Sequence, residues 1–162
     1  MAVQTTYLTE MAAAYNGMIA NTEPNVLISR EVETSAGIGF GVPVIQGTAD
    51  NQVDVVSAST DDVVGITVRD QSVDPSSADT FAQYDTALLL RKGVMWVTVT
   101  DAGGVSAGDD VWVLVSNGTF SNADAGTSGS LKLTGSRWES SAANGALAKI
   151  RFNLDIAATA GA

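Results

Sequence analysis

The sequence predicts an all-β (mainly β) fold, a small β-barrel or sandwich preceded by an N-terminal extended arm or short helix. Short runs rich in Val, Ile, Thr and Trp recur along the chain, separated by clusters of Gly, Asp, Asn and Ser. This texture is typical of closely spaced strands joined by tight turns. Between residues 148 and 156, apolar and polar side chains alternate with period two, which indicates a strand with one buried and one wet face. No alternation of helix and strand patterns is visible, which argues against an α/β fold.

The length fits one domain with short extensions. A chain of 162 residues with 45% apolar residues can bury roughly 70% of its unfolded surface, so its core needs neither a metal nor a disulfide. We expect an N-terminal arm over residues 1–24, a single β-barrel or sandwich domain over 25–156, and a flexible tail over 157–162. The tail contains only Ala, Thr and Gly.

The residues from Tyr7 to Asn21 form the best helix candidate of the chain. They include the good helix formers of Glu10–Tyr15, and Gly17 offers a stop. About two turns of helix are too short to be stable alone, so the segment must dock on something or stay extended. Docking on its own domain and docking on a partner both remain open. Its apolar contacts fall at i, i+4, i+7 and i+8, and they are Met11, Tyr15, Met18 and Ile19.

After Pro24 the expected elements are strands and turns. Residues 26–32 form the first expected strand, and Pro43 near the start of the next suggests a sheet edge. Gly93 is expected to bulge or bend the long β run over residues 86–100. Asn117-Gly118 predicts a two-residue hairpin turn of type I′. The other expected strands cover residues 42–46, 53–56, 63–69, 111–115, 119–120, 131–133, 137–139 and 148–156.

Composition excludes several classes of function. The chain has no Cys and no His, which removes thiol nucleophiles, disulfides, zinc sites built on those residues, and the commonest general base. Eight basic and eighteen acidic residues give a net charge of −10. This charge repels nucleic-acid phosphates and anionic membranes. The apolar runs are too short to span a bilayer, and the first residues lack the features of a secretory signal peptide.

No pattern of catalytic or ligand-binding residues emerges. The pairs Asp61-Asp62 and Asp109-Asp110 lie in turns directly before β runs, where Asp accepts backbone N–H bonds. Calcium binding by these carboxylates is the alternative, but neither pair sits in an EF-hand-type loop. The glycines of residues 37–41 lack the β-α context of a phosphate-binding loop. We therefore predict no catalytic residue, no cofactor and no metal site.

The positions of the tryptophans are the sequence feature that most strongly indicates a contact surface. In the run over residues 94–100, Trp96 faces away from Met95 and Val97. In the run over 111–115, Trp112 and Leu114 lie opposite valines, so that strand is apolar on both faces. Since a small barrel has one interior, the outer face must be covered by an arm or loop of the chain or by a neighbouring subunit. Trp96, Trp112 and Leu114 are candidate subunit contacts, and burial in the core is the alternative.

Several stretches, taken in order, resemble the structural cement (head-decoration) family of tailed bacteriophages. The resemblance covers roughly residues 15–115. It depends on order and spacing, because each piece alone is an ordinary strand or turn signal. The stretches are Tyr15-Asn16-Gly17-Met18-Ile19-Ala20-Asn21, Ile28-Ser29-Arg30-Glu31-Val32-Glu33, Gly41-Val42-Pro43-Val44, Val64-Gly65-Ile66-Thr67, Arg91-Lys92-Gly93-Val94-Met95-Trp96-Val97 and Val105-Ser106-Ala107-Gly108-Asp109-Asp110-Val111-Trp112-Val113.

The resemblance implies a non-enzymatic capsid protein of the virion, made in the host cytoplasm and bound to the outer surface of the head. It implies a homotrimer whose N-terminal arm reaches over neighbouring major capsid subunits and stabilises the expanded shell. Its partners would be the major capsid protein and copies of itself, with no nucleic acid and no membrane. The alternative from a different class is a carbohydrate- or receptor-binding β module of a phage fibre or surface adhesin.

Overall fold

The computed structural model describes residues 14–73, 79–123, 125, 129–154 and 159–160, and these form strands and turns with no helix. The predicted all-β class is therefore confirmed. The strands are β1 (Val26–Val32), β2 (Ile38–Gly39), β3 (Pro43–Gln46), β4 (Gln52–Val55), β5 (Val63–Thr67), β6 (Thr80–Phe81), β7 (Thr86–Thr98), β8 (Asp110–Leu114), β9 (Thr119–Ser121), β10 (Ser130–Trp138), β11 (Leu147–Asn153) and β12 (Thr159–Ala160).

Five of the strands close into a small barrel. Neighbours pair in the order β1-β4-β3-β5-β7, and β1 also pairs with β7, which completes the ring. The β1–β4 pair is parallel, while the other pairs of the ring are antiparallel. The short sheet of β2 and β6 adds Ile38 and Phe81 to the core cluster formed by barrel residues such as Val32, Val44 and Leu89.

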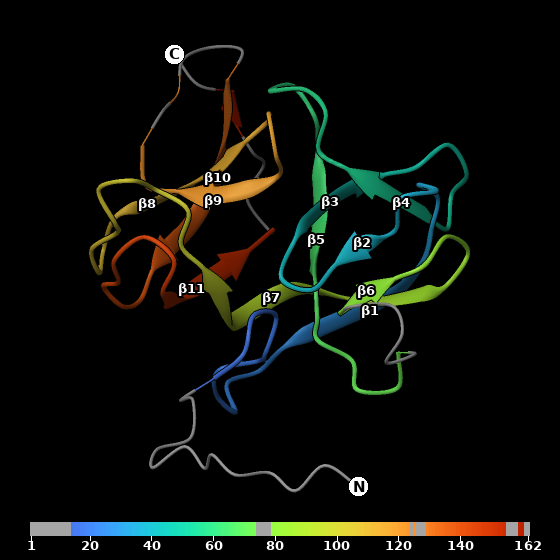
Figure 1. The fold of residues 1–162 in the computed structure, drawn as a ribbon, viewed down its shortest axis with the longest axis horizontal. Helices are drawn as coiled ribbons and strands as arrows, with labels where there is room; N and C mark the ends of the chain where they lie inside the picture. Colours follow the sequence, from blue (N-terminus) through green and yellow to red (C-terminus); the bar gives the residue numbers. More distant parts are fainter. Residues whose placement is uncertain (1–13, 74–78, 124, 126–128, 155–158, 161–162) are drawn as a thin grey trace, which may run out of the picture.

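The sheet continues past β7 into a second lobe, so that the long strand β7 belongs to both lobes. The sheet continues β7-β11-β10-β8-β9, and a parallel bridge between Val99 and Phe120 brings the last strand back to the end of β7. Figure 1 shows β8 to β11 on the left, the barrel strands on the right, and β7 running beneath both. The larger core cluster joins this lobe to β5 through residues such as Ile66, Met95, Trp138 and Phe152.

The last long strand follows its predicted pattern. Ala148, Ile150 and Phe152 of β11 are buried, while Arg151 between them is exposed. Period-two alternation therefore identified the inward face correctly. The end of the expected strand, residues 155–156, lies outside the described residues.

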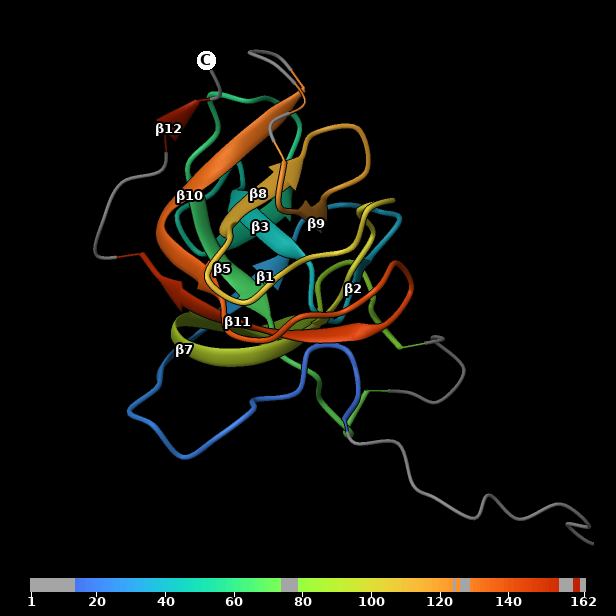
Figure 2. The same ribbon diagram turned by 90° about the vertical axis from the view of Figure 1, so that its left-hand side faces the viewer.

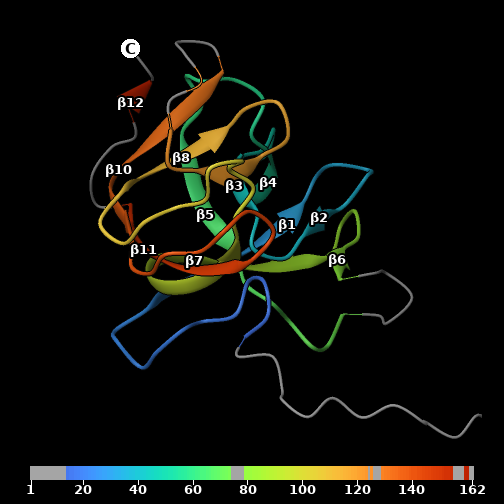
Figure 3. The same ribbon diagram turned by 60° about the vertical axis from the view of Figure 1, so that its left-hand side comes forward.

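The N-terminal segment, residues 14–21, is not helical; it turns at Asn16-Gly17 and then runs along β7. Gly17 N–H donates to Trp96 C=O at 2.8 Å, Trp96 N–H donates to Met18 C=O at 2.8 Å, and Ala20 N–H donates to Val94 C=O at 2.8 Å. Figures 2 and 3 show this part of the chain, in blue, directly below β7. The helix prediction is wrong over these residues because the free edge of β7 offers backbone partners that an isolated short helix cannot match. Residues 1–13 of the expected arm lie outside the described residues.

Gly93 bends β7 where the strand passes from one lobe to the other. Its φ is +142°, and a Cβ at this position would lie 2.1 Å from the Asn25 side-chain oxygen. The register of β1 on β7 shifts in the same region, between Val26 and Leu27. The predicted irregularity at Gly93 is thus confirmed, and only glycine meets both the backbone and the spatial requirement.

Two expectations were wrong: the sheet-edge position of Pro43 and the type of the β8–β9 turn. Pro43 is not on a sheet edge, because β3 pairs with β4 on one side and with β5 on the other. Proline fits there as the first residue of the strand. The β8–β9 hairpin is present, but its loop spans residues 115–118 and only Gly118 has positive φ, whereas a type I′ turn needs two such residues.

Candidate interaction surfaces

Trp96 lies on the outward face of β7. Its neighbours Met95 and Val97 are fully buried, so the indole between them points away from the core. Lys149 is its cross-strand partner on β11, and the Lys149 ammonium lies 5.0 Å from the indole centroid. The pair forms a half-exposed cation–π contact, the type of amphipathic surface that recurs in protein interfaces.

Trp112 and Leu114 form a second outward surface, on β8. Both are half-buried and alternate with the buried residues Val111 and Val113, as the sequence predicted. Lys132 of β10 pairs with Trp112 across the strands, with its ammonium 5.5 Å from the indole centroid. The part of the chain that the structure describes does not test the subunit-contact role of Trp96, Trp112 and Leu114, which stays a prediction.

The carboxylate of Asp110 neutralises two cations of β10, Lys132 and Arg137. The Asp110 carboxylate lies 2.5 Å from the Lys132 ammonium and 2.5 Å from the Arg137 guanidinium. These pairs are partly exposed, so each contributes little to stability. The ion pair with Asp110 also orients the Lys132 ammonium beside the Trp112 indole.

A depression of about 550 Å³ adjoins Trp96. One side of it is formed by Ala14, the first described residue of the N-terminal segment. The lining is Ala14, Trp96, Ser140, Ser141, Gly145, Ala146 and Leu147, mostly small side chains around one indole.

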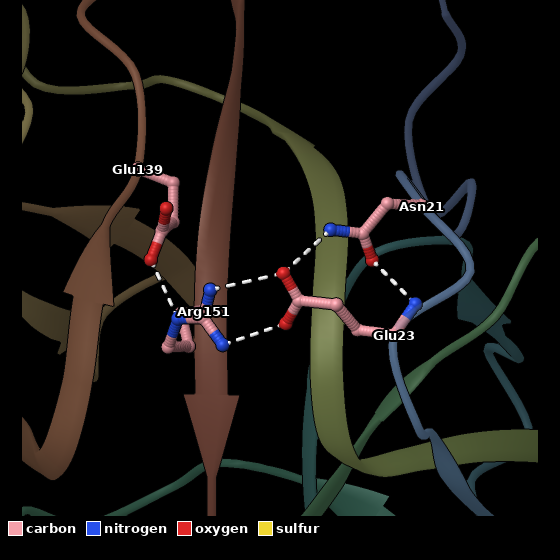
Figure 4. A network of polar contacts seen from close by, with 4 residues as sticks. All are labelled: Asn21, Glu23, Glu139 and Arg151. Carbon is pink, nitrogen blue, oxygen red and sulfur yellow. Dashed lines mark hydrogen bonds and ion pairs between the residues drawn. The ribbon is translucent and has the colours of Figure 1, made fainter.

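Arg151 of β11 links the loop before β1 to the end of β10. Its guanidinium donates to both Glu23 oxygens, at 2.7 and 3.2 Å, and its Nε donates to Glu139 at 2.6 Å (Figure 4). Asn21 completes the network with a 3.0 Å bond to Glu23. The hydrogen bond from Arg151 lowers the pKa of Glu23, and the hydrogen bonds to Glu23 and Glu139 raise the pKa of Arg151.

The residues predicted as arm contacts differ in how far they are buried. Tyr15 is 54% exposed, and the Arg69 guanidinium stacks 5.2 Å from its ring centroid. Ile19 forms a bridge with Met95 and packs against the core, while Met18 is half-buried. Met11 lies outside the described residues. The structure therefore brings Ile19 to this domain's own core and leaves Tyr15 accessible.

One member of each Asp pair, Asp61 and Asp109, accepts backbone N–H bonds in a turn, as the sequence predicted. Asp61 accepts backbone N–H bonds from Ser57 and Ala58 at 2.8 and 2.7 Å. Asp109 accepts from the Asn122 side chain and the Ser106 N–H, and these bonds lower its pKa. Across the described ranges, no group of three or more carboxylates is placed to hold a metal ion. No helix within those ranges is long and apolar enough to cross a membrane.

Sequence reasoning missed the Arg69 cluster. Arg69 is ion-paired to Asp79 at 2.8 Å and also lies 5.1 Å from the Phe40 ring centroid, so it sits among three separate segments. No local pattern marks this arginine, because its partners come from distant parts of the chain. The alternation of Lys149 and Arg151 with buried residues was visible, but it did not reveal their partners on other strands.

The comparisons agree with this architecture. The family model of the structural cement protein (E217 gp24/Pam3 gp6) matches residues 3–153. No curated protein sequence matches the chain. Among solved structures, a chain from the capsid of Myoviridae phage XM1 is 22% identical with a TM-score of 0.72, covering 94% of this chain and 98% of that one. That likeness shows a shared fold.

The family match favours a capsid role over the carbohydrate- or receptor-binding alternative. It spans the N-terminal segment, the barrel and the second lobe, and so includes every surface described above. The chain therefore belongs to the structural cement protein family of phages, and it is a structural component of the virion capsid.

Proposed function

We propose that this chain binds the outer surface of the expanded phage head and bridges neighbouring major capsid subunits without catalysing a reaction. The supporting observation is the match of the structural cement family over residues 3–153. The half-exposed Trp–Lys contacts on the outward faces of β7–β11 and β8–β10 are the surfaces available for assembly. Tryptophan side chains are frequent hot spots of binding energy at protein interfaces. A partner that covers these faces would remove apolar surface from water.

The charge of the chain fits a protein partner better than nucleic acid. A net charge of −10 opposes contact with phosphate, whose binding depends on neutralisation by Lys and Arg. The four cations of β10 and β11, Lys132, Arg137, Lys149 and Arg151, all have aromatic or carboxylate partners. They form no unpaired basic stripe.

The assembly state in this proposal is a homotrimer, as expected from the family resemblance. Trp112 and Leu114 are the proposed contacts between copies, together with Trp96. The proposed capsid contacts are Tyr15 and the residues before it, including Met11. Because Met18 and Ile19 lie against β7 of this domain, they are left out of the proposed capsid contacts.

Co-sedimentation with expanded, undecorated heads tests the proposal. Purified protein is titrated against heads, and bound copies are counted per major capsid subunit. Saturation at a fixed, symmetry-related ratio supports the proposal, and absence of binding by folded protein to intact heads refutes it. A variant lacking residues 1–13 should keep its melting temperature but bind more weakly. Trp112→Ala should bind more weakly and shift the oligomer toward monomer in analytical ultracentrifugation.

A further inference from the structure

Tyr84, in the loop between β6 and β7, has the most exposed of the large apolar side chains in the described part of the chain. Its exposed fraction is 67%, compared with 54% for Tyr15 and less for the others. No described hydrogen bond, ion pair or ring contact involves its side chain. The phenol ring therefore contributes little to the fold of this chain.

The backbone of Tyr84 is strained for a tyrosine. Its φ is +68°, and Asp79 is the only other non-glycine residue with positive φ among the described residues. Tyr84 is the third residue of a turn that Asp85 N–H closes by donating to Ala82 C=O at 3.1 Å. Gly or Asn is the usual residue where that position has positive φ. Tyr84 thus occupies a position that glycine would stabilise, without a compensating contact inside the chain.

The loop is nevertheless firmly held. Tyr84 N–H donates to Val32 C=O at 2.8 Å, and Val32 N–H donates to Asp85 C=O at 2.9 Å. The Gln83 side chain donates to Glu33 C=O at 2.8 Å, and Asp85 accepts from the Ala82 N–H at 2.9 Å. These bonds tie the loop to the end of β1. An exposed aromatic ring on a rigid loop loses little conformational freedom on binding, which favours its use as a binding anchor.

The location of the loop separates it from the tryptophan surface of β8. Figure 1 is drawn with the longest axis horizontal, and the β6–β7 loop lies at the right end while β8 lies at the left. A subunit that contacts one neighbour at each end can bridge two neighbours. The Tyr84 end is therefore suited to a contact distinct from that of Trp112.

The charges around Tyr84 indicate the kind of partner. The Asp85 carboxylate lies within the loop, where it accepts the Ala82 N–H, and the chain as a whole has a net charge of −10. A second copy of this chain would bring like charge to the contact, while a surface with basic side chains around an apolar pocket would be complementary. We propose that Tyr84 inserts into an apolar, basic-rimmed pocket on a subunit of the capsid shell. This inference rests on the proposed function.

The test compares Tyr84→Gly, Tyr84→Asn and Tyr84→Phe in the titration of expanded, undecorated heads. Glycine and asparagine both accept positive φ, so these variants should melt at or above the wild-type temperature. Both should raise the Kd for heads at least tenfold, as expected for loss of a binding anchor. Tyr84→Phe keeps the ring and the strain, and should stay within threefold of wild type.

The outcomes separate this inference from the proposed function. If wild type, Tyr84→Gly and Tyr84→Asn all bind heads with equal affinity, the role of Tyr84 is overturned and the capsid function stands. Failure of wild type to bind heads overturns both. Unchanged head binding with a reduced oligomeric mass of the free glycine variant would assign Tyr84 to a contact between copies, which also overturns the inference.

Discussion

Asn16→Ala tests whether the N-terminal segment belongs to the folded domain. The Asn16 side chain links the loop after β2 to the end of β7: its Nδ2 donates to Phe40 C=O at 2.6 Å, and its Oδ1 accepts from Thr98 N–H at 2.9 Å. Both bonds are partly buried. Alanine removes them and leaves a carbonyl and an amide of the main chain without these partners.

The magnitude follows from those two bonds. A net hydrogen bond contributes about 1 kcal/mol, and a buried group left without a partner costs about 1–3 kcal/mol. Partial exposure lets water satisfy some of the lost bonding, so we expect the free energy of unfolding to fall by about 2–4 kcal/mol. For a domain of this size, that corresponds to a decrease in melting temperature of about 5–15 °C.

Urea unfolding followed by circular dichroism measures the change. Asn21→Ala is the matched control, because Asn21 lies in the same segment but its bonds to Glu23 are exposed. The control should cost less than about 0.5 kcal/mol. If Asn16→Ala is no more destabilising than the control, the segment does not hold its place on β7 in solution, and the two Asn16 hydrogen bonds do not stabilise the domain.

Three further predictions concern the fold. Gly93→Ala should lower the free energy of unfolding by about 2–4 kcal/mol in urea titrations, since a Cβ there is both strained and obstructed; a change below about 1 kcal/mol would contradict the bend. Trp138→Ala, which removes a buried indole, should cost about 3–5 kcal/mol in the same assay, whereas Trp112→Ala should cost about 1 kcal/mol or less; equal costs would place Trp112 in the core. Melting temperature should be nearly constant between about pH 5.5 and 8, because no His or Cys titrates. It should fall below about pH 4.5, where carboxyls with lowered folded pKa, such as Glu33 and Asp109, bind protons more readily in the unfolded chain; a transition near pH 6.5 would contradict this account.

Local patterns identified much of the secondary structure. The first strand was predicted over the residues that β1 occupies, and the alternation in β11 identified its buried face. These features depend on short-range sequence periodicity and on β-type residues next to turn formers. The same logic correctly separated the two faces of β8, and the structure then showed that Trp112 lies on the half-buried outward face.

Local patterns also misled where distant partners compete. The helix prediction near Tyr15 relied on good helix formers, but β7 offers that segment a ready-made edge of backbone donors and acceptors. Residues 131–133 and 137–139 were expected as two strands, yet they form one irregular strand, β10. Gly135, with a φ of +80°, lets the strand continue through the irregularity.

Composition and neighbouring residues were enough to predict the all-β class and to exclude thiol and histidine chemistry. They put Trp96 and Trp112 on the strand face opposite their valine neighbours, but left open whether that face was exposed or buried in the core. The closure of the barrel by β1 on β7 and the contact of Glu23 with Arg151, 128 positions apart in the sequence, became visible in the folded chain. It alone revealed Tyr84 as an exposed ring on a strained, hydrogen-bonded loop. Contacts of this kind depend on how distant segments pair, and no local periodicity encodes that pairing.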